Sequence, residues 1–231
     1  MKRSEINAIL AEGDAFIRSF GYVMPPFAYL SPEALKERVL SDSPGILAGR
    51  LGWDITDFGT GRFAEIGLFL FSVRNGSAED LKSGRGMLYA EKIMISKKDQ
   101  LCPMHRHIVK AEDIINRGGG TLVLELFESN ADGSLCPEKP VNVVTDGRHV
   151  TLPAGGLLSL LPGESVTLMP GSWHAFRAEK ADVLIGEVST VNDDLTDNIF
   201  RDPVGRFADV TEDEAPKYLL VSDYDTWLMQ P

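Results

Sequence analysis

The chain has only two cysteines, Cys102 and Cys136, which lie 34 positions apart and form no CxxC pair. A disulfide-stapled scaffold is therefore not indicated, and 231 residues bury enough apolar surface to fold without one. No apolar run approaches the ~18 residues that a membrane-spanning helix needs. After a basic start, Glu5, Glu12 and Asp14 interrupt the apolar segment that a signal peptide would require. We therefore expect a cytoplasmic protein with no membrane partner.

Basic residues are also scarce. The chain has 23 Lys and Arg against 34 Asp and Glu, which gives a formal net charge of −11. This balance disfavours binding to nucleic acid, whose phosphates would be repelled, and to an anionic membrane surface. The chain also lacks a GxGxxG or P-loop motif, so no nucleotide cofactor is indicated. A small neutral ligand is the partner that this composition allows most readily.

Helical patterns occur near the start of the chain. Apolar residues in 4–20 recur at a spacing of roughly 3.6, and two prolines at 25–26 prevent the helix from continuing. Ser31 is placed to cap a second helix, with Pro32 in its first turn. This helix is expected to end near residue 40, and a turn-rich stretch follows. We expect residues 1–60 to form a mainly helical N-terminal extension.

From about residue 63 the chain changes to short apolar runs separated by Gly, Asp, Asn and Pro. These runs are typical of strands, and Asp146-Gly147 is a predicted hairpin turn. Helices followed by many strands favour an antiparallel β-sandwich or barrel with the helices packed on it. No repeat or second domain is indicated. We expect one domain over residues 1–231, with the β-barrel spanning 61–231.

Two of the four histidines, His105 and His107, lie one residue apart in the stretch LCPMHRHIVKAE. On a strand they would face the same side, about 7 Å apart, and could reach one metal ion. Glu112 follows after four residues, and His174 in MPGSWHAF is the candidate for a third imidazole. Such a mixed nitrogen and oxygen set suits Mn²⁺, Fe²⁺, Co²⁺, Ni²⁺ or Zn²⁺ and leaves room for two substrate oxygens.

The competing interpretation of this stretch is a pair of surface histidines on a strand, which an HxH pattern alone does not exclude. Glu112, the glycine at 119 and the glycine-anchored His174 argue against it. The remaining histidine, His149, follows the predicted hairpin turn and is expected to be exposed. Three glycines at 118–120 predict a sharp bend after Glu112, although an ordinary hairpin turn would also fit them.

Charged residues interrupt three apolar strands: Lys92 in AEKIMIS, Glu125 in TLVLELF and Glu187 in VLIGEVS. An unpaired buried charge costs several kcal/mol, so each side chain should either face solvent or belong to a polar site. Glu187 is favoured for a site because small residues flank it and its strand adjoins His174.

Three further charged residues lie near the predicted metal ligands. Lys110 stands between the second histidine and Glu112. The acidic segment VNDDLTDNIF could be a solvated loop, or it could place Asp194 or Asp197 at the rim of a pocket. In the second case these carboxylates would bond to a ligand's hydroxyl groups or to a lysine such as Lys92.

The histidine motif resembles that of the cupin superfamily. His105, His107, Glu112 and Gly119 fit the spacing of the first cupin motif. Gly163, Gly171 and His174 fit the second, in which Met169 replaces a proline and Ala178 an asparagine. The resemblance implies a double-stranded β-barrel, or jelly roll, with the three histidines and Glu112 as metal ligands inside its mouth.

These groups suit an aldose–ketose isomerisation. A metal ion that binds two adjacent oxygens would polarise a carbonyl and its neighbouring hydroxyl. A carboxylate could then move a proton between C1 and C2 through an enediol, and a lysine could stabilise charge on the oxygen. Lys110 and Glu187 are the candidates for these catalytic roles, with Lys92, Glu125, Asp194 and Asp197 as candidates for binding the substrate.

A closer resemblance covers nearly the whole chain. The segments HRHIVKAEDIINRGGG, MPGSWHAF, EVSTVNDDLTDNIF and EDEAPKYLL are similar to those of the D-lyxose isomerase family. The resemblance implies a sugar isomerase, usually Mn²⁺-dependent, that interconverts D-lyxose with D-xylulose and D-mannose with D-fructose. It places Lys110 and Glu187 in the sugar pocket without assigning the catalytic base.

Two other functions remain open for a cupin with these ligands: an Fe²⁺ dioxygenase and a non-catalytic sugar-binding protein. A dioxygenase of this kind usually has an apolar pocket, whereas Lys110 and Glu187 favour proton transfer in an isomerase. A homodimer is expected, since cupins commonly associate through barrel edges.

Overall fold

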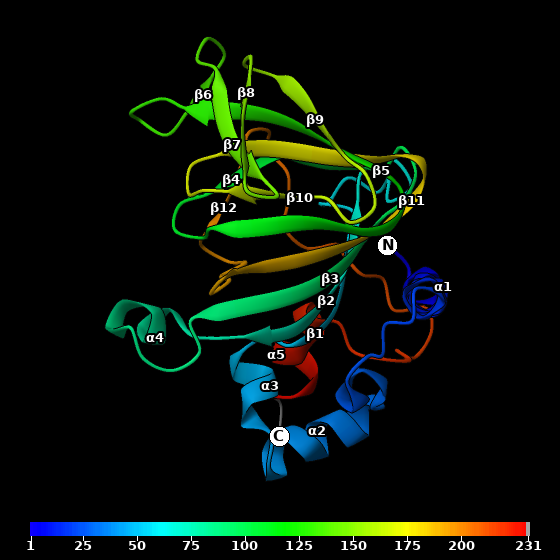
Figure 1. The fold of residues 1–231 in the computed structure, drawn as a ribbon. Helices are drawn as coiled ribbons and strands as arrows, with labels where there is room; N and C mark the ends of the chain where they lie inside the picture. The colour runs from blue at the N-terminus through cyan, green and yellow to red at the C-terminus, as the bar shows by residue number, and fades with distance from the viewer. Residues whose placement is uncertain (230–231) are drawn as a thin grey trace.

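The computed structural model describes residues 1–229 and is dominated by strands (Figure 1). The helical segments are α1 (Arg3–Ser19), η1 (Pro26–Tyr29), α2 (Pro32–Ser41), α3 (Pro44–Ala48), α4 (Ala78–Ser83), η2 (Val221–Asp223) and α5 (Tyr224–Trp227). The strands are β1 (Gly52–Thr56), β2 (Leu68–Asn75), β3 (Tyr89–Ser96), β4 (Leu101–His107), β5 (Glu112–Ser129), β6 (Leu135–Cys136), β7 (Val141–Thr145), β8 (Arg148–Leu152), β9 (Gly156–Leu160), β10 (Ser165–Leu168), β11 (Trp173–Thr190) and β12 (Asn198–Phe200).

Two long strands, β5 and β11, form the centre of the antiparallel sheet. They pair with each other along most of their length. One half of β11 pairs with β3 and the other half with β4, while β5 pairs with β10 at one end and with β9 at the other. The two halves of each long strand therefore have different neighbours, and the sheet curls into a barrel. This confirms the expected antiparallel barrel with helices packed on it.

The helices cover one outer face of the barrel. Figure 1 shows α1, α2, α3 and α5 gathered beside β1–β3, with the first and last parts of the chain side by side. The caps expected from the sequence are present, since the Ser31 side chain accepts a hydrogen bond from the N–H of Ala34. Arg3 is fully buried and binds the carboxylate of Asp223 with both terminal nitrogens, which ties the two ends of the chain together.

Strand β2 shows how the sequence builds two cores at once. Leu68 and Leu70 point into the barrel, whereas Phe69 and Phe71 point outward. The outward pair packs with residues such as Ile6 of α1, so both faces of the strand are buried. A strand covered on both faces needs a continuous apolar run rather than an alternating one.

Two local features differ from the sequence-based expectation. Strand β1 lies inside the range expected to be mainly helical, where its pairing with β2 makes it part of the barrel. The glycines at 118–120 form neither a hairpin turn nor a strand break, because β5 runs through them. A Cβ atom at Gly119 would lie 2.0 Å from the carbonyl oxygen of Asp182 in β11, so the glycines permit a close approach of two strands. The predicted hairpin turn at Asp146-Gly147 is confirmed between β7 and β8.

No helix among the described residues is long and apolar enough to cross a membrane.

Candidate metal centre and active site

Three histidines converge inside the barrel. His105 and His107 lie at the end of β4, and His174 lies near the start of β11, directly across from His105 in the strand register. One ring nitrogen from each imidazole lies within 4.8 Å of the other two. Glu112, the first residue of β5, brings its Oε1 to 3.3 Å from His107 Nε2 and 3.2 Å from His174 Nε2. The four residues expected to bind a metal are therefore brought together.

The backbone sets which ring nitrogens carry protons. The Nδ1 atoms of His105, His107 and His174 face the carbonyl oxygens of Pro103, Asp197 and Ser172 at 2.8, 3.2 and 3.1 Å. A carbonyl can only accept, so each Nδ1 donates and each neutral ring presents an unprotonated Nε2. The Nε2 atoms of His107 and His174 face Glu112 Oε1, a buried oxygen with no hydrogen-bond donor among the described residues. A cluster of lone pairs of this kind fits a cation.

Electrostatics keeps these ligands in the forms that bind metal. Burial lowers the pKa of His105 well below its usual value, and the neighbouring imidazoles lower it further. Burial also lowers the pKa of His107, with a further contribution from the Lys110 ammonium. Burial alone would raise the pKa of Glu112, but the Lys110 ammonium acts against it, and that pKa lies well below its usual value. Neutral imidazoles and a carboxylate are the states that a divalent ion requires.

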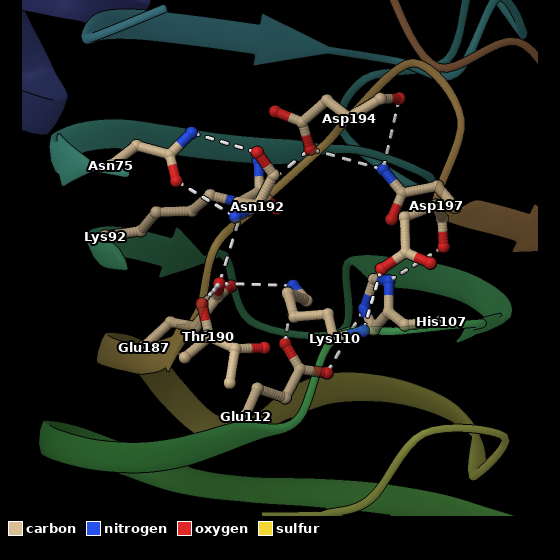
Figure 2. Close-up of polar contacts among 12 residues, drawn as sticks. Asn75, Lys92, His107, Lys110, Glu112, Glu187, Thr190, Asn192, Asp194 and Asp197 are labelled. Carbon is tan, nitrogen blue, oxygen red and sulfur yellow. Dashed lines mark hydrogen bonds and ion pairs between the residues drawn. The ribbon is translucent and has the colours of Figure 1, made fainter. Parts of the chain in front are cut away.

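A chain of alternating charges leads away from this cluster. Lys110 Nζ lies 2.8 Å from Glu112 Oε2 and 3.2 Å from Glu187 Oε1 (Figure 2). Lys92 Nζ lies 3.6 Å from the same Glu187 oxygen, which also accepts a hydrogen bond from Ser189. All three contacts fall on Oε1 of Glu187. Burial opposes the charge on Lys110, but its two carboxylate partners raise its pKa above the usual range.

A bulge in β11 allows His174 and Glu187 to serve the same pocket. The two residues are 13 positions apart, and an odd separation on a regular strand would place them on opposite faces. The register with β5 shifts between Glu179 and Val183, where Lys180 has a φ of 72°. Residues 180–182 stand opposite one residue of β5, and this irregularity exchanges the two faces, so His174 and Glu187 both line the pocket.

The far end of the pocket carries three more charges. Lys92 donates to Asn192 Oδ1 at 2.7 Å and lies 3.6 Å from Asp194 Oδ1. Arg206 spans two carboxylates, with one terminal nitrogen 3.2 Å from Asp194 and the other 2.8 Å from Asp54. Burial would raise the pKa of Asp194, but Arg206 and then Lys92 lower it well below the usual range. This end is therefore an ion-paired network rather than a set of free ligands.

The space between the two ends is a pocket of about 470 Å³, including the part open to solvent. The charged groups line it together with an apolar wall formed by Phe58, Leu70, Met94, Ile114, Phe176 and Phe200. A few polar groups against apolar walls are the usual composition of small-molecule sites.

Sequence comparisons identify the family. A sequence model of the D-lyxose isomerase family matches residues 1–224. The D-lyxose/D-mannose isomerase of Serratia proteamaculans is 44% identical over 97% of this chain and 98% of its own. That of Escherichia coli O157:H7 is 43% identical over the same shares. The chain belongs to the D-lyxose isomerase family. It is therefore an aldose–ketose isomerase.

Solved structures confirm the fold. The L-ribose isomerase of Cellulomonas parahominis, crystallised with L-psicose, aligns over 91% of this chain and 98% of its own, with a TM-score of 0.60 and 18% identity. The L-ribose isomerase of Geodermatophilus obscurus aligns over 90% of this chain and 98% of its own, with a TM-score of 0.58 and 19% identity. The double-stranded β-barrel of cupin type expected from the sequence is thus the fold of this D-lyxose isomerase family member.

Two of the expected substrate-binding residues lie outside the pocket of this family member. Glu125 does not line it, because Leu124 and Leu126 take the inward positions of β5 and turn Glu125 to the outer face. Asp197 does not line it either. Its carboxylate accepts three backbone hydrogen bonds, from the N–H groups of residues 108–110. Lys92 and Asp194, in contrast, both line the pocket. His149 lies exposed on β8, as expected.

Sequence reasoning missed three polar residues of the site: Asp54, Asn192 and Arg206. Arg206 lies in an irregular segment with no periodic pattern, placed by the hydrogen bond from Gly205 N–H to the carbonyl of Phe58. Asp54 lies in β1, which was not predicted as a strand. Asn192 belongs to the VNDDLTDNIF segment, in which only carboxylates were predicted to bind a ligand. An acidic residue within an apolar GWDIT strand was the one available signal, because burial demands a partner for it.

Proposed function

We propose that this enzyme interconverts D-lyxose with D-xylulose and D-mannose with D-fructose by metal-assisted proton transfer through a cis-enediol. The relatives named D-lyxose/D-mannose isomerase support the choice of sugars. The observation that carries the proposed mechanism is the placement of the Glu187 carboxylate between two buried ammonium groups, beside the lone-pair cluster of His105, His107, His174 and Glu112. A small neutral sugar also agrees with the acidic character of the chain.

The proposed cofactor is a divalent ion, Mn²⁺ first and Co²⁺, Zn²⁺, Fe²⁺ or Ni²⁺ as alternatives, held by His105, His107, His174 and Glu112. The distances of 3.2 and 3.3 Å from Glu112 Oε1 to the Nε2 atoms of His174 and His107 place these donor atoms close enough to hold one ion together. When bound, the ion would act as a Lewis acid on the carbonyl and the adjacent hydroxyl of the sugar.

Glu187 is the proposed acid–base group. Its Oε1 is occupied by Lys110, Lys92 and Ser189, which fixes the carboxylate and leaves Oε2 for the substrate. In our mechanism Oε2 takes the proton from C2 of the aldose and returns it to C1 of the enediol, while the hydroxyl proton on O2 passes to O1. C1 thereby becomes an alcohol carbon and C2 the carbonyl of the ketose. General catalysis by a positioned carboxylate contributes typically ~10²–10⁴-fold.

Lys110 is proposed to stabilise negative charge that develops on the substrate oxygens. Its Nζ lies between Glu112 and Glu187, and therefore between the proposed metal site and the proposed base. Its ammonium remains protonated because two carboxylates raise its pKa. A fixed cation in a buried site acts on such charge without the reorganisation that water would need.

Lys92 and Asp194 are proposed to bind the distal hydroxyl groups of the sugar, together with Arg206. All three line the end of the pocket opposite the histidines. Hydroxyl groups both donate and accept, so a sugar can bond to the ammonium, the carboxylate and the guanidinium of this network at once. A cytoplasmic location and a homodimer remain predictions.

The decisive experiment is an assay of ketose formation over a panel of aldoses, with the enzyme first stripped of metal and then supplied with Mn²⁺. We expect turnover of D-lyxose and D-mannose that depends on the added ion. Sugar binding without turnover would instead support a non-catalytic binding protein, and oxygen uptake would support a dioxygenase. Full activity in the metal-free preparation would refute the mechanism.

A further inference from the structure

Asp197 lies beside the metal centre but outside the pocket. Its side chain is buried, with 7% of the residue exposed. Oδ1 accepts hydrogen bonds from the N–H groups of Ile108 and Val109, both at 2.8 Å, and Oδ2 accepts one from Lys110 N–H at 2.9 Å. Its own carbonyl oxygen accepts the Nδ1–H of His107 at 3.2 Å. Figure 2 shows Asp197 beside His107, with the hydrogen bond between them drawn as a dashed line.

Three of these contacts go to one short turn, and the fourth goes to the residue just before it. The turn joins the end of β4 to the start of β5, with His107 before it and Lys110 within it. None of the three N–H groups at 108–110 has another acceptor among the residues that the structure describes. Asp197 therefore supplies the hydrogen bonds that hold the backbone between a proposed metal ligand and a proposed charge-stabilising lysine.

We propose that Asp197 is a positioning residue: its carboxylate fixes the 108–110 turn, and its carbonyl fixes the ring of His107, so that one residue couples metal affinity to the placement of Lys110. This inference rests on the metal site of the proposed function. Hydrogen bonds to the non-coordinating nitrogen of a ligand histidine set its tautomer and orientation, and their loss typically costs ~10–100-fold in metal affinity or activity.

The chemistry of the turn requires a carboxylate rather than an amide. Three donors converge on Asp197, and an ionised carboxylate has only acceptor sites. In Asp197→Asn, one oxygen would have to serve three N–H groups while the new NH₂ group pointed at a donor. At least one buried N–H would lose its partner, which costs ~1–3 kcal/mol. The turn and the 193–197 segment would then separate, and the Asp197 carbonyl would move away from His107.

Asp193 offers a matched control in the same segment. Its Oδ1 accepts from the N–H groups of Leu195 and Thr196, and its Oδ2 accepts from the Thr196 hydroxyl. It stabilises the segment's own fold without a hydrogen bond to the 108–110 turn or to a metal ligand. Asp193→Asn therefore makes the same chemical change four residues away. It distinguishes a general destabilisation of the segment from the specific loss of the hydrogen bonds to the 108–110 turn.

The first experiment titrates metal-free wild type, Asp197→Asn and Asp193→Asn with Mn²⁺ and follows free Mn²⁺ by electron paramagnetic resonance. We expect Asp197→Asn to bind Mn²⁺ ~10–100-fold more weakly than wild type, and Asp193→Asn to remain within about threefold. At saturating Mn²⁺ the Asp197 variant should also show a lower kcat, because Lys110 is displaced. Wild-type affinity in a folded Asp197→Asn protein would overturn the inference. A wild type that binds no Mn²⁺ would overturn the proposed metal site itself and this inference with it.

A second experiment uses wild type alone, so it does not depend on a variant that folds. Coupling between two sites is reciprocal, so metal binding should stabilise the hydrogen bonds to Asp197 if those bonds stabilise metal binding. Hydrogen exchange followed by mass spectrometry should show slower exchange of the 108–110 amides when Mn²⁺ is added. The amides of Leu195 and Thr196, held by Asp193, should change less. Equal exchange at 108–110 with and without bound Mn²⁺ would contradict the coupling.

Discussion

The two ends of the pocket are built in different ways. At the histidine end, neutral rings are oriented by backbone carbonyls, and their free nitrogens face a carboxylate oxygen that has no donor among the described residues. At the opposite end, the cations Lys92 and Arg206 are paired with the carboxyl groups of Asp194 and Asp54. The lone pairs at the first end could bind a cation, whereas the charged groups at the second end are already paired with one another. A ligand at the second end must form hydrogen bonds with groups that are already paired. That end can therefore select a sugar by the positions of its hydroxyl groups without supplying the reactive groups.

The largest effect should follow from removing a group at the histidine end. We expect His174→Ala, like chelation of wild type, to abolish isomerisation, because a ligand to the Lewis acid is lost. Mn²⁺ or Co²⁺ should restore the chelated wild type but not the variant at the same concentration. His149→Ala on the exposed strand β8 is the control and should retain both bound metal and activity. Measured metal content and initial rates decide the outcome, and an active variant free of metal would remove His174 from the site.

Glu187→Gln should have the next largest effect, on chemistry rather than on metal binding. The amide keeps the shape of the carboxylate but cannot take up a proton, so kcat should fall ~10²–10⁴-fold. Metal affinity and sugar binding should be largely retained, because Glu187 lies beside Lys110 and Lys92 rather than among the histidines. Steady-state kinetics, with calorimetry of D-lyxose binding, separates the two effects. Turnover close to wild type would show that another group moves the proton.

The same contrast explains what the sequence could predict. His105, His107 and Glu112 are close together in a strand-turn-strand unit, and strand alternation is enough to place the two histidines on one face. His174 was predicted as the third imidazole from its place in the MPGSWHAF segment, and the family resemblance then supported it. Arg206 lies in irregular backbone, and nothing local indicates which cavity it enters. The bulge at Lys180 that lets Glu187 share a face with His174 depends on the pairing of β11 with β5, which a single strand's pattern does not reveal.

Asp197 shows a second reason why the sequence alone does not predict the whole site. Composition identified an acidic segment, but the partners of its carboxylates depend on where the 108–110 turn lies in space. Asp194 points into the pocket and Asp197 binds backbone N–H groups, although only three positions separate them. Residue type predicted a polar role for both, and only tertiary structure distinguishes binding a ligand from holding a turn.

At the ion-paired end, Asp194→Asn should mainly change stability. The substitution leaves Arg206 and Lys92 without one buried partner, and breaking a buried ion pair from one side costs about 3 kcal/mol in the free energy of unfolding. Sugar affinity should fall as well, through a higher KM. Asp99→Asn, an exposed change, is the matched control. Urea denaturation at pH 7 measures the difference, and equal stability of the two variants would contradict the role of the network.

The pH dependence of that difference gives a sharper test. Arg206 and Lys92 outweigh burial and lower the pKa of Asp194 in the folded state below its unfolded value of about 3.9. The folded state therefore binds this proton more weakly, and its stabilising contribution is fully present above that unfolded value. The gap between wild type and Asp194→Asn should stay constant from about pH 7 to pH 5 and narrow only below about pH 4. A gap that closes near neutral pH would assign the effect to another group.

The smallest effect is expected on the outer face of the barrel. Glu125 lies on the side of β5 away from the pocket, half-buried near Arg201, whereas Leu124 and Leu126 pack inside. Glu125→Gln should leave kcat and KM within about twofold of wild type, because substitutions away from buried networks change free energies by ~0.5 kcal/mol or less. Glu125→Gln and Glu187→Gln are the same chemical change at two sites. The first carboxylate lies on the outer face of the barrel and the second lies in the pocket. A tenfold loss of kcat in Glu125→Gln would mean that the outer face also controls the reaction. Strand alternation would then not distinguish the carboxylates that take part in the reaction from those that do not.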